Sequence, residues 1–291
     1  MTARILSGKD LTATLETEMR GEAERLEAAG SPPCLAVVLV GADPASHTYV
    51  RNKIKAAERV GIASVDKFLP ESTTQKELEG VIAELNADPA VHGILCQLPL
   101  PKGLDAERIT RLIDPAKDVD CFHPSNVGLL AMGTPRFLPC TPAGVLALMT
   151  RNGVAISGKH AVILGRSNVV GRPLSLLLSR KGTDATVTVC HSRTPNLEEL
   201  TRQADIVVAA TGMTPEWVTG DMVKEGAVVI DVGMHRVEDA SKKSGFRITG
   251  DVHYESVAPK CSAITPVPGG VGPMTITMLL RNTLTAARNP A

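Results

Sequence analysis

The sequence predicts an α/β fold with two domains, and this expectation rests on three observations. The chain has 291 residues, and domains of about 150 residues are typical, which favours two of them. Short runs of β-branched residues alternate with helical patterns along the whole chain, which indicates a mainly parallel sheet with helices. A second series of such runs begins after a proline-rich stretch at residues 99–142. We therefore place the domain boundary near residue 140.

The first half contains three predicted strands and two predicted helices. The strands are expected at 35–40, 64–69 and 91–95. Between them, helical spacing of apolar residues predicts helices at 45–60 and 75–86. The stretch 99–142 is expected to be irregular because many prolines interrupt it.

The second half begins a fresh series of strands. They are expected at 161–164, 186–189, 206–209 and 228–232. Such a run of βα units is typical of a Rossmann-like, doubly wound nucleotide-binding domain. A Gly/Pro-rich loop at 265–273 and an amphipathic helix at 274–287 follow it. Because this helix lies outside the βα pattern, we expect it to return to the first domain. The predicted domains are 1–140 together with 274–291, and 141–273.

Composition argues against several classes of protein. Basic and acidic residues each number 31, so the formal net charge is zero, whereas a general nucleic-acid binder carries a basic excess. The longest apolar stretch, 34–42, is too short to span a bilayer, and the first thirty residues lack an apolar signal core. The six cysteines form no C-x-x-C pair, and the histidines show no zinc-binding spacing. We expect a cytoplasmic protein with reduced thiols, no structural metal and no membrane or nucleic-acid partner.

A glycine-containing turn follows the predicted strand 161–164. Gly165, Arg166 and Ser167 lead to Gly171 and a predicted helix, with Pro173 near the helix start. Glycines at a strand-to-helix turn let the backbone approach a phosphate, and the new helix offers free N–H groups. The spacing is G-x5-G rather than G-x-G-x-x-G, so an ordinary βα turn is the alternative interpretation.

The residues after the next strand favour NADP over NAD. An NAD site usually places an acidic residue about 20 positions beyond the last glycine, where it holds the ribose diol. The count from Gly171 reaches His191, and its neighbours are Ser192, Arg193 and Thr194 rather than a carboxylate. Hydroxyls and a cation suit a 2′-phosphate, which Arg166 could also reach. The alternative is that Arg193 simply faces water.

Tyr49 and Lys53 are candidate catalytic residues. They lie four positions apart on the predicted helix 45–60 and so share one face. A lysine in a low-dielectric site has a lowered pKa and can exchange protons. The alternative is a solvated face of charged residues. The pair also matches the Tyr-x-x-x-Lys of short-chain dehydrogenases, but here it precedes the glycine turn by more than a hundred residues, which excludes that assignment.

Three further segments are candidates for a ligand site. Gln97 follows the predicted strand 91–95, and the carboxyl ends of parallel strands are where ligands bind. Asp118 and Asp120 flank one valine, so a strand-like alternation would put both carboxylates on one side, although loop aspartates are more often caps or turn formers. The segment 266–275 is too rich in Gly and Pro for a core element, and such a loop lines a cleft or moves over one.

Together these segments resemble the bifunctional 5,10-methylenetetrahydrofolate dehydrogenase/5,10-methenyltetrahydrofolate cyclohydrolase family. The resemblance extends over nearly the whole chain, with the segments in the same order and at the same spacing. The matching segments are Ser46-x-x-Tyr49-x-x-x-Lys53-x-Lys55, Gln97-Leu98-Pro99, Lys117-Asp118-Val119-Asp120, Pro139-Cys140-Thr141-Pro142, Gly165-Arg166-Ser167 to Gly171, Cys190-His191-Ser192 and the loop 265–275.

The resemblance implies a substrate domain and an NADP-binding Rossmann domain flanking a cleft. It also implies two consecutive reactions of one-carbon metabolism, which serve purine biosynthesis. These are NADP-dependent oxidation of methylenetetrahydrofolate and then, in the same cleft, hydrolysis of the methenyl product to 10-formyltetrahydrofolate. By the resemblance, Lys53 handles protons with help from Gln97, and Tyr49 stacks on the folate. Asp120 bonds the pterin edge.

The resemblance assigns the remaining site residues to two groups. Those that close on the folate are Pro268, Gly269, Gly270 and Thr275. Those expected at the cofactor are Gly165, Arg166, Ser167, Gly171, Ser192, Arg193, Thr211, Gly212, Val232 and Gly233. The family also suggests a homodimer.

One position departs from the family pattern. Asp-Val-Asp-Gly is usual, and here Cys121 follows Asp120. If that glycine needs a positive φ, we expect the cysteine to change the turn and the aim of Asp120. Two alternatives to the bifunctional enzyme are a monofunctional dehydrogenase, which the presence of Lys53 and Gln97 disfavours, and a non-catalytic NADP sensor. A sensor is expected to have lost Tyr49, Lys53 or Asp120.

Overall fold

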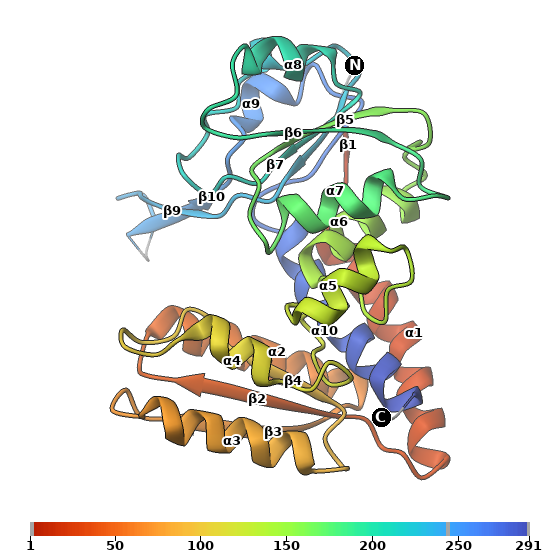
Figure 1. Cartoon of the computed structure of the whole chain (residues 1–291). Coiled ribbons are helices and arrows are strands. Elements are labelled where there is room, and N and C mark those ends of the chain that lie inside the picture. The colour runs from red at the N-terminus through yellow and green to blue at the C-terminus, as the bar shows by residue number, and fades with distance from the viewer. Residues whose placement is uncertain (1–2, 243–244, 290–291) are drawn as a thin grey trace. The chain divides into compact units, whose positions relative to one another are not determined.

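The computed structural model describes residues 3–242 and 245–289, and contacts divide the chain into two units (Figure 1). We call Ala13–Cys140 with Ile276–Ala291 the three-stranded unit, and Met1–Thr12 with Thr141–Thr275 the six-stranded unit. The predicted division put all of 1–140 in one domain, whereas the residues before Ala13 belong to the six-stranded unit.

The three-stranded unit is built on a parallel sheet. Its strands β2 (Cys34–Val40), β3 (Ala63–Leu69) and β4 (Gly93–Cys96) lie in the order β3-β2-β4. All seven residues of β2 are buried, as expected for a central strand that is covered on both faces. Alternate residues of β2 pack against buried Leu78 and Ile82 of α3 (Gln75–Ala87), which runs along the sheet in Figure 1.

Helix α2 (Pro44–Val60) carries the first catalytic candidates, and its ends are fixed by local interactions. The Asp43 side chain caps it by accepting the backbone N–H of Ser46 at 2.8 Å, and Pro44 occupies the first turn, where its missing N–H costs nothing. Gly61 ends the helix with φ +85°, the left-handed conformation that glycine adopts readily. The helix therefore matches the predicted 45–60 almost residue for residue.

The stretch predicted to be irregular contains helices. These are α4 (Ala106–Leu112), α5 (Pro124–Ala131) and the start of α6 (Cys140–Arg151). The prediction was wrong because a proline such as Pro124 sits at the first position of α5, where it helps to start a helix. The predicted final helix is α10 (Val271–Arg288), and its residues from Ile276 onward belong to the three-stranded unit. The charged start of the chain forms α1 (Gly8–Ala28).

The six-stranded unit has the doubly wound sheet that the sequence predicts. Its strand order is β1-β11-β8-β7-β5-β6, and every described pairing in it is parallel. The strands are β1 (Arg4–Ile5), β5 (His160–Leu164), β6 (Thr186–Cys190), β7 (Ile206–Ala209), β8 (Val228–Asp231) and β11 (Ala263–Ile264). Because β6 and β7 lie on opposite sides of β5, the strand order reverses there, and such switch points are where ligands bind.

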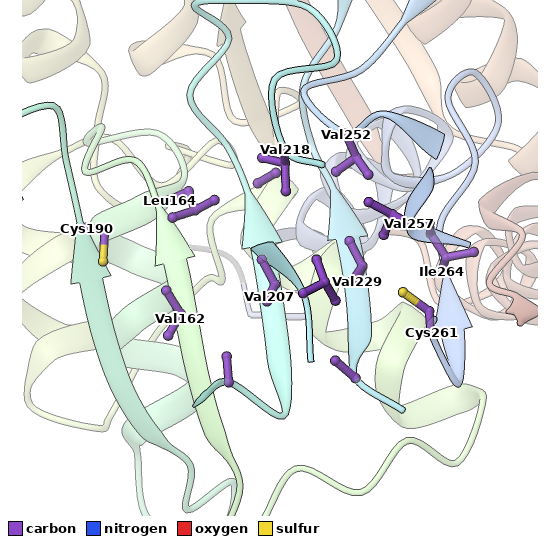
Figure 2. Close-up of a cluster of buried hydrophobic side chains, with 14 residues drawn as sticks. Val162, Leu164, Cys190, Val207, Val218, Val229, Val252, Val257, Cys261 and Ile264 are labelled. Carbon is purple, nitrogen blue, oxygen red and sulfur yellow. The ribbon is translucent and has the colours of Figure 1, made fainter. Parts of the chain in front are cut away.

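Apolar residues of this sheet form a continuous core, shown in Figure 2. Val162, Val207 and Val229 come from three adjacent strands, and each is completely buried. This unit also contains α6 from Thr141 onward and the first residues of α1 and α10. Its other helices and its hairpin are α7 (Gly171–Ser179), α8 (Leu197–Gln203), η1 (Gly220–Met222), β9 (His235–Glu238), β10 (Phe246–Thr249) and α9 (Tyr254–Val257). Strands β9 and β10 pair antiparallel, outside the main sheet.

Two general expectations can be compared with the described residues. All six cysteines are buried and free of disulfide bonds. Over residues 3–242 and 245–289, no helix combines the length and the apolar character that a membrane crossing requires.

Candidate functional sites

The first site is a buried cluster around Lys53 in the three-stranded unit. Helix α2 places Tyr49 one turn before Lys53, and the Lys53 Nζ lies 4.5 Å from the centroid of the Tyr49 ring. The same Nζ donates a hydrogen bond of 3.0 Å to the Gln97 Oε1. Only 5% of Lys53 is exposed, so the sequence alternative of a solvated face is wrong for this lysine.

Gln97 is held in one orientation by the end of β4. Its backbone N–H donates to the Val38 carbonyl at 2.9 Å, and its side-chain Nε2 donates to the Leu98 carbonyl at 2.6 Å. Because the Nε2 is used in this way, the Oε1 is the atom turned toward Lys53. An amide oxygen accepts from the amine whether or not the amine is protonated, so Gln97 fixes the position of Nζ without fixing its charge.

Asp120 completes the charge balance of this cluster. Burial lowers the pKa of the Lys53 amine, while the nearby Asp120 and Cys140 act to raise it. Burial raises the pKa of the Asp120 carboxyl, while the Lys53 charge and a hydrogen bond with the Cys140 thiol act to lower it. The amine and the carboxyl are thus both easier to neutralise than exposed groups, which suits proton exchange with a bound substrate.

Asp118 has a different task from Asp120. It is buried and accepts hydrogen bonds from the backbone N–H groups of Phe122 (3.1 Å) and His123 (2.8 Å) and from the Asn126 side chain (2.8 Å). The turn-forming alternative is therefore correct for Asp118, which holds the loop before α5, while His123 is the residue that caps this helix. Asp120 is the carboxylate that faces Lys53.

Cys121 occupies a left-handed turn. Its φ is +63°, so the position does need the conformation that favours glycine. The thiol is buried and donates to the Phe137 carbonyl at 3.5 Å. The expected effect of the cysteine on the aim of Asp120 stays a prediction.

The predicted folate-closing loop belongs to the six-stranded unit. The Gly269 carbonyl accepts from the Lys9 backbone at 3.0 Å, and Gly270 lies so close to Gly8 at the start of α1 that a side chain on Gly8 would collide with it. The Thr275 hydroxyl lies 3.0 Å from the Thr141 hydroxyl. Pro268 is exposed. These contacts tie the loop to elements at both ends of its unit's sequence, and its role in folate binding stays a prediction.

The second site is a cavity of about 480 Å³ in the six-stranded unit. It lies where β5, β6 and β7 end, the position that the strand order predicts for a ligand. Its lining residues are Leu164, Gly165, Arg166, Ser167, Cys190, His191, Ser192, Thr194, Leu197, Ala210, Thr211, Met213, Thr214 and Trp217.

Five of the predicted cofactor residues line this cavity. They are Gly165, Arg166, Ser167, Ser192 and Thr211. The lining offers the guanidinium of Arg166, several hydroxyls, and apolar surface from Leu197, Met213 and Trp217. None of these described lining residues is acidic, so the cavity lacks the carboxylate that usually holds an NAD ribose. A nucleotide with an anionic 2′ substituent fits this set of side chains.

The other predicted cofactor residues lie outside the described lining. Gly171 supports the turn, because a side chain there would collide with the Gly165 carbonyl. Arg193 is exposed, Val232 donates its backbone N–H to the Ala209 carbonyl, and Gly233 donates to Asp231. The Gly212 N–H is bound by Asp251. A direct role for any of them in cofactor binding stays a prediction.

Sequence reasoning missed several residues of both sites. Cys140 appears in the matching segments without a role, and Asn282 and Trp217 were not proposed at all. Trp217 is the single tryptophan of the chain, and in a sequence with 2% aromatic residues that rarity was the available signal. For Asn282, no local pattern connects helix α10 to Val119, whose carbonyl it binds at 2.7 Å.

Comparison with known proteins gives consistent matches over both units. The model of the tetrahydrofolate dehydrogenase/cyclohydrolase catalytic domain matches residues 6–120, and that of the NAD(P)-binding domain matches residues 139–291. The bifunctional protein FolD of Cytophaga hutchinsonii is 52% identical over 287 residues, covering 98% of this chain and 99% of the relative.

Solved structures agree with the sequence matches. The bifunctional methylenetetrahydrofolate dehydrogenase/cyclohydrolase of Campylobacter jejuni is 48% identical, with a TM-score of 0.94 over 99% of this chain and 100% of that one. The Trypanosoma brucei enzyme, solved with NADP and an inhibitor, is 41% identical, with a TM-score of 0.93 over 99% and 98% of the two chains.

Proposed function

Because this chain belongs to the tetrahydrofolate dehydrogenase/cyclohydrolase family, we propose that its two sites perform the two reactions of that name. The first is oxidation of 5,10-methylenetetrahydrofolate with NADP⁺, and the second is hydrolysis of 5,10-methenyltetrahydrofolate to 10-formyltetrahydrofolate. The predicted family, the α/β fold class and the bifunctional enzyme class are confirmed. The assignment of individual residues to each reaction is our proposal.

The Lys53–Gln97 hydrogen bond is the observation that carries the hydrolytic half. Water adds to the cationic methenyl carbon and must lose a proton, and a ring nitrogen must gain one when the C–N bond breaks. An amine whose pKa is lowered by burial accepts the first proton and returns it at the second step. Gln97 holds the Nζ in place for both transfers, Tyr49 packs beside it, and Asp120 anchors the polar edge of the folate.

The dehydrogenase half depends on positioning. NADP⁺, when bound, supplies the acceptor for a hydride from the methylene carbon, and this transfer needs no proton. Arg166 and Ser192 are proposed to hold the 2′-phosphate, with Arg193 beside them. The fit of NADP is supported by the absence of acidic side chains among the described residues that line the cavity.

Replacement of Lys53 tests the proposal, with a matched control on the same helix. Lys53→Met is expected to lower the cyclohydrolase rate by at least about 100-fold, because proton transfer by a positioned side chain contributes on that scale. Lys55→Met, at an exposed position of the same helix, is expected to retain the rate. The decay of the methenyl chromophore reports the reaction, and titration with NADP⁺ shows that the cofactor pocket is intact.

Two results would contradict this assignment. Full cyclohydrolase activity in Lys53→Met removes the proposed role of the amine. A wild-type enzyme that forms NADPH while methenyltetrahydrofolate accumulates is a dehydrogenase with an impaired hydrolytic half.

We also propose a cytoplasmic homodimer. The six buried free thiols agree with a reducing compartment. Strand β3 is an edge of its sheet, and Phe68 on it is 52% exposed, so this edge offers both backbone groups and apolar surface to a second copy. Sedimentation of the wild type and of Phe68→Glu, in which the added charge should favour the monomer, tests the dimer.

A further inference from the structure

The antiparallel hairpin β9–β10 contacts the loop that closes one side of the cofactor cavity. We call residues 211–217 the cavity loop. The two terminal guanidinium nitrogens of Arg247 on β10 donate to the Glu216 carboxylate, at 2.7 and 3.1 Å. Thr249, two residues further along β10, donates its hydroxyl to the same carboxylate at 2.7 Å. A carboxylate in the cavity loop is thus held by a two-pronged ion pair and a third hydrogen bond.

The hairpin also reaches the start of the cavity loop through Asp251. This completely buried carboxylate accepts from the backbone N–H and the hydroxyl of Thr211, at 2.7 and 3.0 Å, and from the N–H of Gly212. On its other side, His235 of β9 places its Nε2 2.7 Å from Asp251. The two ends of the cavity loop are therefore anchored, one directly and one through Asp251, to the two strands of a single hairpin.

The anchored residues are the ones that shape the cavity. Thr211, Met213, Thr214 and Trp217 line it, and the Trp217 indole N–H donates to the Thr211 hydroxyl at 3.1 Å. Glu216 itself is not among the described lining residues, but it directly precedes Trp217. Any shift of Glu216 would therefore move the large apolar side chain that forms part of the cavity wall.

Glu216 has an unfavourable backbone conformation, and several hydrogen bonds hold it there. Its φ is +57°, in the left-handed region that side chains other than glycine seldom adopt. Its backbone N–H donates to the Gly250 carbonyl at 2.9 Å, in addition to the three side-chain bonds. Hydrogen bonds from Arg247 and Thr249 lower the pKa of the carboxyl to about 2, so the ion pair is formed at all ordinary pH values.

We propose that Glu216 is a positioning residue for the cofactor, and that through it the β9–β10 hairpin sets the affinity of the cavity for the 2′-phosphoadenosine half of NADP. A loop that is already ordered loses less conformational entropy when a ligand binds, so the anchor stabilises the complex without touching the ligand. This inference rests on the proposed function, because it takes the cavity to be the NADP site.

Glu216→Gly is the informative variant. It removes the carboxylate while relieving the positive φ, so the melting temperature should stay within about 2 °C of wild type. The control is Lys224→Met, which breaks the ion pair between Lys224 and Asp205 in the same unit. The two ion pairs are similarly exposed. The side chains of Lys224 and Asp205 are 43% and 31% exposed, and those of Arg247 and Glu216 are 40% and 29% exposed. Neither Lys224 nor Asp205 is among the described residues that line the cavity.

The measurement is the dissociation constant of NADP⁺ and of adenosine 2′,5′-bisphosphate, followed by calorimetry and by the fluorescence of Trp217, the only tryptophan. For Glu216→Gly we expect both constants to rise about tenfold, as for loss of a preorganised loop. The turnover number at saturating NADP⁺ and the cyclohydrolase rate should stay at the wild-type level. Glu216→Gln, which keeps an acceptor for Arg247 and Thr249, should recover part of the affinity.

Three results would overturn the inference. Equal dissociation constants in wild type and Glu216→Gly would show that the anchor has no effect on binding. Equal weakening by Glu216→Gly and Lys224→Met would show a general loss of stability instead of positioning. Failure of the wild type itself to bind either ligand would remove the proposed function as well, and so is distinguishable from the first two.

Discussion

A cysteine at position 121 occupies backbone angles that glycine adopts without steric cost. Its φ is +63°. It directly follows Asp120, the carboxylate beside Lys53. Burial of the cysteine and the hydrogen bond from its thiol to the Phe137 carbonyl stabilise the folded protein. The left-handed backbone conformation destabilises it for any residue that has a Cβ. The turn is thus kept by packing around the side chain.

This balance predicts an order of stability for two substitutions. Cys121→Ala keeps the unfavourable φ and loses the thiol contact, while Cys121→Gly loses the contact but relieves the backbone. We expect the glycine variant to be more stable than the alanine variant by about 1 kcal/mol, measured by urea unfolding. An alanine variant equal to or more stable than the glycine variant would show that the left-handed turn costs nothing here.

Among single residues, local patterns and the family resemblance identified Lys53, Tyr49, Gln97 and Asp120. The structure brings all four together. The spacing of Tyr49 and Lys53 on one helix made their contact predictable. The role of Glu216 was not, because neither its positive φ nor its pairing with Arg247 follows from any periodicity in the sequence. Contacts between loops depend on tertiary structure alone.

Helix α10 stabilises the loop that carries Asp120. Its buried Asn282 donates to the Val119 carbonyl at 2.7 Å and to the Leu138 carbonyl at 2.8 Å, so one amide joins the residue before Asp120 to the segment that leads into α6. Without the amide, the buried Val119 carbonyl would keep only the Cys140 thiol as a donor, at 3.4 Å, and the part-buried Leu138 carbonyl would lose its Asn282 donor. The helix therefore contributes to the geometry of the Lys53 cluster as well as to the core.

Removal of this amide should destabilise the protein. We expect Asn282→Ala to lower the free energy of unfolding by about 2 kcal/mol, because two hydrogen bonds are lost and each intramolecular hydrogen bond contributes about 0.5–1.5 kcal/mol. Asn289→Ala, at an exposed asparagine just beyond the same helix, should change it by less than about 0.5 kcal/mol. Denaturant unfolding of both variants gives the comparison. A similar loss of unfolding free energy in the two variants would refute the stabilising role of the Asn282 amide.

Elements with a strong local pattern were predicted well, and short ones were not. The apolar runs of β2, β5 and β7 and the helices α2 and α3 agree with prediction within a few residues. The two-residue strands β1 and β11 were missed, because a pair of residues carries no periodicity. The hairpin β9–β10 was missed as well, because its strands have four residues each and contain charged residues, so neither shows a run of β-branched residues.

For the whole molecule, the assignment of the two reactions to groups in different units predicts that the activities can be separated. Ser192→Asp would add a carboxylate to the cavity, where it should repel a 2′-phosphate. We expect the Michaelis constant for NADP⁺ to rise at least about tenfold, a loss of about 1.4 kcal/mol in binding. The cyclohydrolase rate should be retained because the Lys53 cluster belongs to the other unit.

The control is Ser179→Asp, which places the same charge at an exposed serine that is not among the described lining residues. Michaelis constants for NADP⁺ and NAD⁺ distinguish two cases: loss of the 2′-phosphate contact raises only the constant for NADP⁺, whereas loss of the whole site raises both. An unchanged Michaelis constant for NADP⁺ in Ser192→Asp would place the 2′-phosphate elsewhere.

Parallel pairing of Arg4 with Ala263 joins the start of the chain to a strand near its other end, and Asn282 reaches back to Val119 in the same manner. A ribosome delivers these partners far apart in time. Strand β1 must wait for β11, and the loop that carries Asp120 must wait for α10. Neither unit can therefore finish folding before α10 has been synthesised. A nascent chain stopped at residue 140 would lack the partners of both β1 and the loop that carries Asp120, so neither unit should reach its native structure before α10 has left the ribosome.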